Sequence, residues 1–393
     1  MLTNRQLFLR HQAQTSPTPL LLEIERAEGS WMYGSGGEKY LDLIAGISVS
    51  NVGHRHPRVL AAIHAQLDKY LHLMVYGEVV QAPQVQLAVA LAATVPAQLD
   101  CAYFVNSGSE AVEVALKLAK RLTGRAELIS AIDSYHGATH GALSVTGNEG
   151  FRRAFRPLLP GVRQIRYNAF EDLAFITPAT AAVLLEVVQG EAGVREPGPG
   201  YLAAVRARCT ETGAFLIFDE IQTGFGRTGT FWGCEQEGVW PDALVCAKGM
   251  GGGMPIGAVL SSRQNLAAFT SDPVLGHITT FGGHPVSCAA ALATLQVIQE
   301  ENLLAAIPAK SALLRAELAS IPGVREVRGR GLLLAAEMDS YEILKPLIDR
   351  ALTVGVLTDW FLFCDNSLRA APPLTISEEE IRFAGAALRE AAK

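Results

Sequence analysis

The amino-acid sequence predicts an α/β protein, with a large domain around a mainly parallel sheet and a smaller α+β domain. Two observations carry this prediction. From about residue 100 onward, short apolar runs alternate with helical or loop segments, which is the pattern of strands buried on both faces and separated by helices. From about residue 285, helical patterns dominate instead. A chain of 393 residues is long enough for two domains with substantial cores.

We expect the large domain to span residues 46–284, and residues 1–45 and 285–393 to build the smaller domain together. Residues 31–43, WMYGSGGEKYLDL, have two aromatic-bearing stretches around a glycine turn, which is typical of a β-hairpin. This hairpin is expected to join the C-terminal part of the chain in the smaller domain.

The expected strands of the large domain are short apolar runs, and the first of them leads into a helix. That helix covers residues 109–122 and is closed by Gly124. The runs are residues 101–105 (CAYFV), 126–132 (AELISAI), 181–188 (AAVLLEVV), 214–219 (AFLIFD) and 243–247 (ALVCA). Residues 326–338, EVRGRGLLLAAEM, are expected to belong to the smaller domain, and residues 378–392 to form its final helix.

Composition argues against several classes of function. The net charge is −6 and no block of like charge is present, which does not fit a nucleic-acid-binding surface. Six cysteines are scattered without a CxxC pair, so no zinc site or disulfide framework is indicated, and we expect reduced thiols in a cytoplasmic protein. The first residues lack the apolar core of a signal peptide, and no apolar run approaches the roughly 18 residues that a membrane span needs.

The segment NSGSEAVE follows the first expected strand. Ser107 and Glu110 fit the capping box that opens a helix, and Gly108 and Ser109 lie in the turn. A glycine-containing turn at a helix N-terminus is a possible anion site, because free N–H groups and the helix dipole both favour negative charge there. A simple helix cap is the alternative interpretation.

Two further strand ends carry groups that suit a flat, charged ligand. Tyr135 and His136 precede a glycine after the strand at 126–132, so an aromatic face is available. The strand at 214–219 ends in Asp219, and the period of two places Ile221 on the same face, with Gln222 next to it. A carboxylate held by backbone N–H groups in a turn is the alternative for Asp219.

Lys248 follows the apolar run 243–247 and precedes the glycines of KGMGGGMP. Desolvating an ammonium group is costly, so a lysine at a buried strand end calls for a reason. The stretch has no G-x-G-x-x-G, and the lysine precedes the glycines, so neither a dinucleotide fingerprint nor a Walker A motif is present. A lysine that forms a Schiff base fits this position, and a salt-bridged structural lysine is the alternative.

Ligands of open α/β sheets bind beyond the carboxyl ends of the strands, so these groups are expected to meet. They offer an anion cradle, an aromatic face, a carboxylate and an amine. Pyridoxal 5′-phosphate has a phosphate, a flat ring, a ring nitrogen and an aldehyde. The sequence therefore predicts this cofactor, held through Lys248.

The chain also resembles the class III pyridoxal-phosphate aminotransferases of fold type I, nearest the acetylornithine and ornithine branch. The resemblance runs nearly end to end. It rests on these segments in this order: YLDLIAGISVSNVGHRHPRV, NSGSEAVE, SYHGATHGALSV, EVVQGEAGV, DEIQTGFGRTG, AKGMGGGMPIGA, TTFGGHPVSCAAA and LRAAPPL.

The resemblance implies specific roles around the cofactor ring. Lys248 would bind the aldehyde and then carry a proton between substrate and cofactor, and Asp219 would pair with the pyridine nitrogen. Gln222 would reach the ring hydroxyl. Ile221 would pack on one ring face and Tyr135, next to His136, on the other.

The resemblance also implies phosphate and substrate contacts. Gly108 and Ser109 would bind phosphate, and Thr280 of TTFGGHP would complete that site from a second subunit, so a homodimer with shared active sites is expected. Glu191 and Arg369 match a pair that the ornithine branch uses as a switch. The arginine takes a substrate α-carboxylate in one half-reaction and is held by the glutamate in the other.

One position departs from that branch, which commonly has an arginine after the histidine and glycine of YHG to clamp a substrate carboxylate. This chain has Ala138 there, and an alanine cannot bind a carboxylate in a bidentate manner. We expect ping-pong transfer of an amino group from a terminal amine to a 2-oxo acid. A racemase or aminomutase of the same superfamily is the main alternative, and a cofactor-binding regulator without catalytic activity is another.

Overall fold

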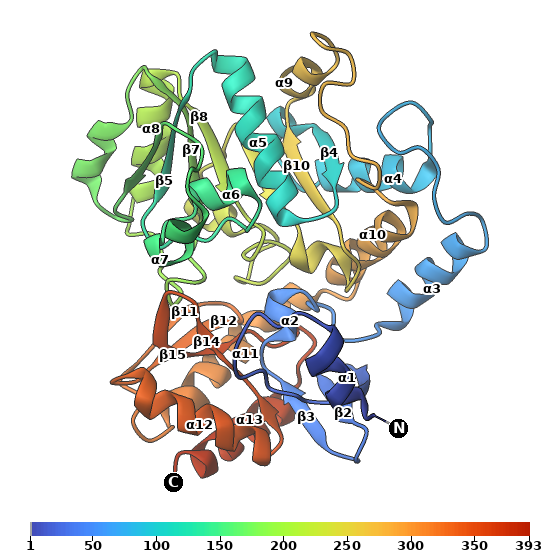
Figure 1. The fold of residues 1–393 in the computed structure, drawn as a ribbon, viewed down its shortest axis with the longest axis vertical. Coiled ribbons are helices and arrows are strands. Elements are labelled where there is room, and N and C mark those ends of the chain that lie inside the picture. Colours follow the sequence, from blue (N-terminus) through green and yellow to red (C-terminus); the bar gives the residue numbers. More distant parts are fainter. Residues whose placement is uncertain (1) are drawn as a thin grey trace.

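A computed structural model describes residues 2–393 of the chain, which contain one large β-sheet and two smaller ones (Figure 1). The large sheet has seven strands in the order β4-β10-β9-β8-β7-β5-β6. Its strands are β4 (Cys101–Val105), β5 (Glu127–Ala131), β6 (Val162–Ile165), β7 (Thr180–Glu186), β8 (Phe215–Asp219), β9 (Ala243–Cys246) and β10 (Gly257–Ser261). Six of these strands run in the same direction, and β10, between β4 and β9, runs opposite to them. The prediction of a mainly parallel α/β sheet is therefore confirmed.

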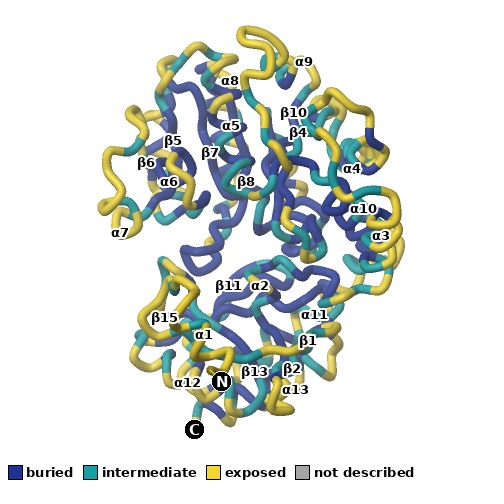
Figure 2. The backbone as a smooth tube through the Cα atoms, turned by 45° about the vertical axis from the view of Figure 1, so that its right-hand side comes forward, coloured by how far each residue is buried: buried dark blue, intermediate teal, exposed yellow. Residues whose placement is uncertain are grey.

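Alternate residues of the central strands enter two different cores, as the side-chain period of two requires. On β8, Leu216 and Phe218 belong to one core, and Phe215 and Ile217 belong to the other. Figure 2 shows these strands as buried. Because both faces are covered, the strands read in the sequence as continuous apolar runs rather than as alternating ones.

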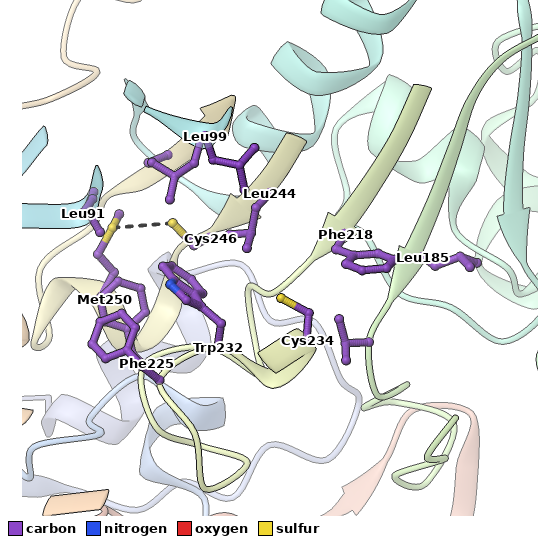
Figure 3. Close-up of a cluster of buried hydrophobic side chains, with 14 of the residues drawn as sticks. Leu91, Leu99, Leu185, Phe218, Phe225, Trp232, Cys234, Leu244, Cys246 and Met250 are labelled. Atoms are coloured by element: carbon purple, nitrogen blue, oxygen red, sulfur yellow. Dashed lines mark hydrogen bonds between the residues drawn. The ribbon is translucent and has the colours of Figure 1, made fainter. Parts of the chain in front are cut away.

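The helices of this part of the chain cover the two faces of the large sheet. Helix α5 packs in one core, and α8 and α10 pack in the other, which also holds the aromatic and sulfur side chains of Figure 3. There Cys246 lies 3.8 Å from the sulfur of Met250. The bounds are α3 (Pro57–Leu67), α4 (Ala82–Ala92), α5 (Gly108–Thr123), α6 (His140–Val145), α7 (Glu149–Arg152), α8 (Tyr201–Thr212), α9 (Arg263–Leu266) and α10 (Pro285–Glu300).

The two ends of the chain come together in the lower part of Figure 1. One sheet has the order β1-β2-β3-β13 and so joins N-terminal strands to a C-terminal one; the other has the order β11-β12-β15-β14. The strands are β1 (Ile24–Glu28), β2 (Trp31–Gly34), β3 (Lys39–Asp42), β11 (Glu326–Arg330), β12 (Leu333–Glu337), β13 (Val356–Leu357), β14 (Trp360–Phe361) and β15 (Cys364–Ala370). The helices are α1 (Asn4–His11), α2 (Ala45–Ser48), α11 (Leu303–Ala319), α12 (Tyr341–Thr353) and α13 (Glu378–Ala391).

The structure contains the hairpin and the final helix that the sequence predicts. The hairpin expected at 31–43 is the antiparallel pair β2 and β3, in which Trp31 lies opposite Leu41. The final helix is α13. The domain boundaries near 45 and 284 stay predictions, and α10, just beyond the second of them, packs mainly on α3 and α4. Within residues 2–393, every helix is too short or too polar to span a lipid bilayer.

Candidate active site

A cavity of about 430 Å³ lies at the carboxyl ends of the parallel strands of the large sheet. Parallel strands end at the same edge, so residues far apart in the sequence meet there. The walls include residues that follow β4, β5, β8 and β9, together with the last residue of β7. Among them are eight residues that the sequence pointed to: Gly108, Ser109, Tyr135, His136, Asp219, Ile221, Gln222 and Lys248.

The turn between β4 and α5 forms one wall of the cavity. The hydroxyl of Ser107 accepts a hydrogen bond from the N–H of Glu110 at 3.2 Å, as the capping motif predicted. The reciprocal half of the capping box was predicted wrongly, because Glu110 accepts from the N–H of Asn106 at 2.7 Å. Gly108 is required for space, since a Cβ there would lie 2.8 Å from the Cδ1 of Ile221.

Asp219 and His136 form a buried pair in the next wall. The Nδ1 of His136 lies 2.7 Å from Oδ2 of Asp219, and the other oxygen accepts from the N–H of Ile221 at 3.0 Å. The Nε2 of His136 is buried and has no partner among the described residues. Asp219 is therefore oriented by one imidazole and one backbone N–H, with its carboxylate at the cavity wall.

Glu186 is a second buried carboxyl group, which the sequence analysis did not single out. It lies opposite Asp219 in the pairing of β7 with β8, and it lines the same cavity. Burial and the charge of Asp219 raise its pKa well above the usual range. The N–H of Gly190 donates to its Oε1 at 3.2 Å. The sequence pattern did not indicate Glu186, because this residue lies within the apolar run 181–188. The sequence also does not show which strands are neighbours in the sheet.

Lys248 begins a single turn (Lys248–Gly251) directly after β9. Its φ is 37°, a conformation that residues with a Cβ rarely adopt. Burial lowers the pKa of its ammonium group, although the charges of Glu191 and Asp219 oppose that effect. Gln222 contributes a buried Nε2 that has no partner within residues 2–393. Beside the amine of Lys248, the cavity thus holds an amide N–H that makes no hydrogen bond to the described part of the chain.

Glu191 and Arg369 form a bidentate ion pair that links the loop after β7, in the large sheet, to strand β15. The two guanidinium nitrogens lie 2.8 and 2.9 Å from the two carboxylate oxygens. Both side chains are buried. Burial alone would raise the pKa of Glu191, but the guanidinium outweighs it and holds that pKa below its ordinary value.

Two remaining positions lie away from the cavity wall. Thr280 is exposed, and it is not among the described residues that line the cavity. Ala138 is exposed as well, and its N–H donates to the hydroxyl of Ser109 at 3.4 Å.

The residues present fit the predicted cofactor. The Nε2 of Gln222, which has no partner among the described residues, is an available donor; the carboxylate of Asp219 lines the cavity; and the glycine turn leaves space beside Ile221. A lysine that binds an aldehyde and a carboxylate for a pyridinium nitrogen are what pyridoxal phosphate requires of a protein. Together with the mainly parallel sheet, this site defines a pyridoxal-phosphate enzyme of fold type I.

Comparison with known proteins places the chain within that class. The family model described as aminotransferase class III matches residues 12–391. An acetylornithine aminotransferase from Methanosarcina mazei is 42% identical over 368 residues, which cover 92% of this chain and 89% of that protein. The chain therefore belongs to the class III aminotransferases, and the predictions of enzyme class and of pyridoxal phosphate as cofactor are confirmed.

Solved structures agree with this assignment. The ornithine aminotransferase of Toxoplasma gondii superimposes with a TM-score of 0.90 at 30% identity, covering 99% of this chain and 94% of that one. An (S)-enantioselective omega-transaminase from Thermomicrobium roseum gives a TM-score of 0.89 at 31% identity, covering 98% and 96% of the two chains.

Proposed function

We propose that the enzyme removes the terminal amino group of an ornithine-, acetylornithine- or lysine-like donor and passes it to a 2-oxo acid by a ping-pong mechanism. The observation that carries this proposal is the buried pair of Glu191 and Arg369. While the pair is closed, the guanidinium of Arg369 is occupied by Glu191, and the described residues that line the cavity include no arginine that could bind an α-carboxylate. The closed ion pair therefore suits a donor whose reacting carbon carries no carboxylate.

The proposed roles of the residues around the cofactor follow from their chemistry. When bound, pyridoxal phosphate supplies an electron sink for the carbon that loses its proton. Lys248 would hold the aldehyde, and after a substrate amine has taken its place, the freed amine of Lys248 would move a proton at that carbon, a task that its lowered pKa favours. Asp219, oriented by His136, keeps the ring nitrogen protonated, and Gln222 donates to the ring oxygen.

The remaining roles concern packing, the phosphate and the substrate. Ile221 and Tyr135 enclose the ring, while Gly108 and Ser109 receive the phosphate at the N-terminus of α5. Arg369 releases Glu191 when a 2-oxo acid brings a carboxylate. These assignments are supported by the positions of the residues in and beside one cavity.

A homodimer with shared active sites completes the proposal, with Thr280 reaching the phosphate of the partner subunit. Its support is the run of exposed apolar side chains in two neighbouring segments. They are Leu71, Leu73, Met74, Val79, Val80, Val274, Leu275, Ile278 and Phe281. The two segments, which also contain Val75 and Thr279, border a second cavity of about 370 Å³. Burying this surface against a second copy would remove apolar area from water.

The proposed working environment is the cytoplasm. Its support is that all six cysteines carry free thiols, which fits a reducing compartment. Burial raises the pKa of several of them, Cys209 to about 12, which favours the protonated and less nucleophilic thiol.

A panel of amine donors against 2-oxo-acid acceptors tests the proposed reaction on the purified enzyme. We expect transfer from terminal amines to an acceptor in a one-to-one ratio, with parallel lines in double-reciprocal plots. Turnover of an amino acid without any 2-oxo acid would instead identify a racemase or aminomutase.

A further inference from the structure

Arg369 is held by a segment of its own part of the chain as well as by Glu191. Its Nε donates to Oδ1 of Asp359 at 2.8 Å, and one terminal nitrogen donates to the carbonyl of Trp360 at 3.1 Å. The guanidinium carbon lies 4.5 Å from the ring centre of Phe361. Residues 359–361 therefore contact the guanidinium at Nε, at the terminal nitrogen that also binds Oε2 of Glu191, and over the Phe361 ring.

The same segment also contacts Glu191. The N–H of Leu362 donates to Oε2 of Glu191 at 3.0 Å, and the N–H of Phe363 donates to its backbone carbonyl at 3.0 Å. Residues 359–363 thus hold both members of the ion pair, Arg369 and Glu191, in the closed state. Glu191 binds the two terminal nitrogens of Arg369, whereas Asp359 binds Nε, so the contact of Asp359 does not depend on the ion pair with Glu191.

Two carboxylates share one guanidinium in this arrangement. Glu191 occupies the edge formed by the terminal nitrogens, which is where a substrate carboxylate binds in a bidentate manner. Asp359 occupies the Nε edge, so an incoming carboxylate displaces Glu191 and still meets the charge of Asp359. Asp359 is partly buried, and like charges that approach a common partner with little water between them repel each other.

We propose that Asp359 is a specificity-determining residue, whose carboxylate weakens the binding of a substrate α-carboxylate at Arg369 and so favours donors that react at a terminal amine. The inference rests on the proposed function, since it concerns the same site. An asparagine at 359 keeps the oxygen that accepts from Nε but removes the charge. The two effects of Asp359, orientation and repulsion, can therefore be separated.

Calorimetric titration of glutarate into the cofactor-loaded enzyme tests this inference, because glutarate carries carboxylates but no reacting group. We expect Asp359→Asn to tighten the dissociation constant about tenfold, which corresponds to about 1.4 kcal/mol. Arg369→Ala should abolish this binding, which would locate it at the arginine. Asp365→Asn is the matched control: it removes the same charge from the same hairpin at an exposed position that forms no ion pair within residues 2–393.

A steady-state comparison adds a second readout. In Asp359→Asn, the KM for the 2-oxo acid should fall about tenfold, while the KM for a terminal amine donor without an α-carboxylate stays unchanged. Weaker glutarate binding in Asp359→Asn, or binding equal to that of the wild type, overturns the inference, because Asp359 then only orients Arg369 or has no effect. An enzyme that transfers no amine to any acceptor refutes the proposed function instead, and the glutarate titration still decides the role of Asp359.

Discussion

The carboxylate of Asp219 is fixed by His136, whose Nδ1 lies 2.7 Å from it, and both side chains are buried. The aspartate ends strand β8, and the histidine follows β5, two strands away in the sheet. The contact therefore depends on the strand order of the whole sheet. It holds one carboxylate oxygen while the N–H of Ile221 holds the other.

Replacing Asp219 with alanine is expected to remove most of the activity and part of the stability. Without a negative charge at the ring nitrogen, the electron sink weakens, and several kcal/mol of transition-state stabilisation should be lost, at roughly 1.36 kcal/mol per tenfold in rate. The ring of His136 would then have no partner for either nitrogen, which costs about 1–3 kcal/mol of unfolding free energy. Turnover and thermal melts measure the two effects separately. A folded, cofactor-loaded variant that works at full rate would contradict the role.

Lys248→Ala is expected to lose both the absorption band of the covalently held cofactor and the turnover. The matched control is Lys248→Arg, which keeps the positive charge but cannot form an imine with an aldehyde. Both variants should therefore lack the band, which shows that charge alone does not hold the cofactor. Near-wild-type amine transfer by either variant would be incompatible with the assignment.

The strand ends could be predicted from the sequence because strands buried on both faces are continuous apolar runs, and a polar residue after such a run marks the carboxyl edge. Asp219 and Lys248 were found in this way. Glu186 was not, since its pairing with Asp219 depends on which strands are neighbours. The contact between Asp359 and Arg369 depends on the pairing of β14 with β15, which a hydrophobic pattern does not specify.

Thr280→Ala is expected to weaken cofactor binding about tenfold, because one hydrogen bond to a charged phosphate is lost. Hybrid dimers can show whether it acts across the subunits. A subunit with Lys248→Ala paired with one carrying Thr280→Ala has one site with both residues intact only if Thr280 serves the partner's site. Co-expressed hybrids should then regain tight cofactor binding at one site per dimer. Hybrids without such a site would place Thr280 in the site of its own chain.

The affinity for a carboxylate ligand should depend on pH through Asp359. Burial raises the pKa of its carboxyl group to about 6, although Arg369 opposes this effect. The other charged groups that act on it are Glu191 and Asp42. Protonation removes the repulsion, so glutarate should bind several-fold more tightly as the pH falls from about 8 to about 6.

Calorimetry of the wild type and of Asp359→Asn over this range checks the prediction. The variant carries no charge at this position, so its affinity should change much less. The raised pKa of Asp359 also affects the free energy of unfolding. A carboxyl group with a raised pKa contributes stability at low pH that is lost as the pH rises toward about 6. Equal pH dependence of glutarate binding in both proteins would exclude Asp359 as the titrating group.

Recognition of a second substrate carboxylate is expected to be weak because Ala138 offers no cation. Of the arginines that follow in the sequence, Arg156 is bound to Glu149 at 2.7 Å. Like Ala138, the three arginines at 152, 153 and 156 are not among the described residues that line the cavity. Introducing Ala138→Arg should therefore raise kcat/KM for 2-oxoglutarate relative to pyruvate about ten- to a hundredfold, the range for a charged hydrogen bond of ~1.5–3 kcal/mol.

Two comparisons make this specificity test decisive. Ala138→Met adds a side chain of similar length without charge, so it should leave the ratio of 2-oxoglutarate to pyruvate near that of the wild type. Arg369→Ala should impair 2-oxoglutarate and pyruvate alike, because both carry the α-carboxylate that Arg369 binds. If Ala138→Arg leaves the ratio unchanged, position 138 does not face the distal carboxylate. If Arg369→Ala leaves both acceptors untouched, the α-carboxylate binds elsewhere, and the ion pair with Glu191 serves only to hold the two parts of the molecule together.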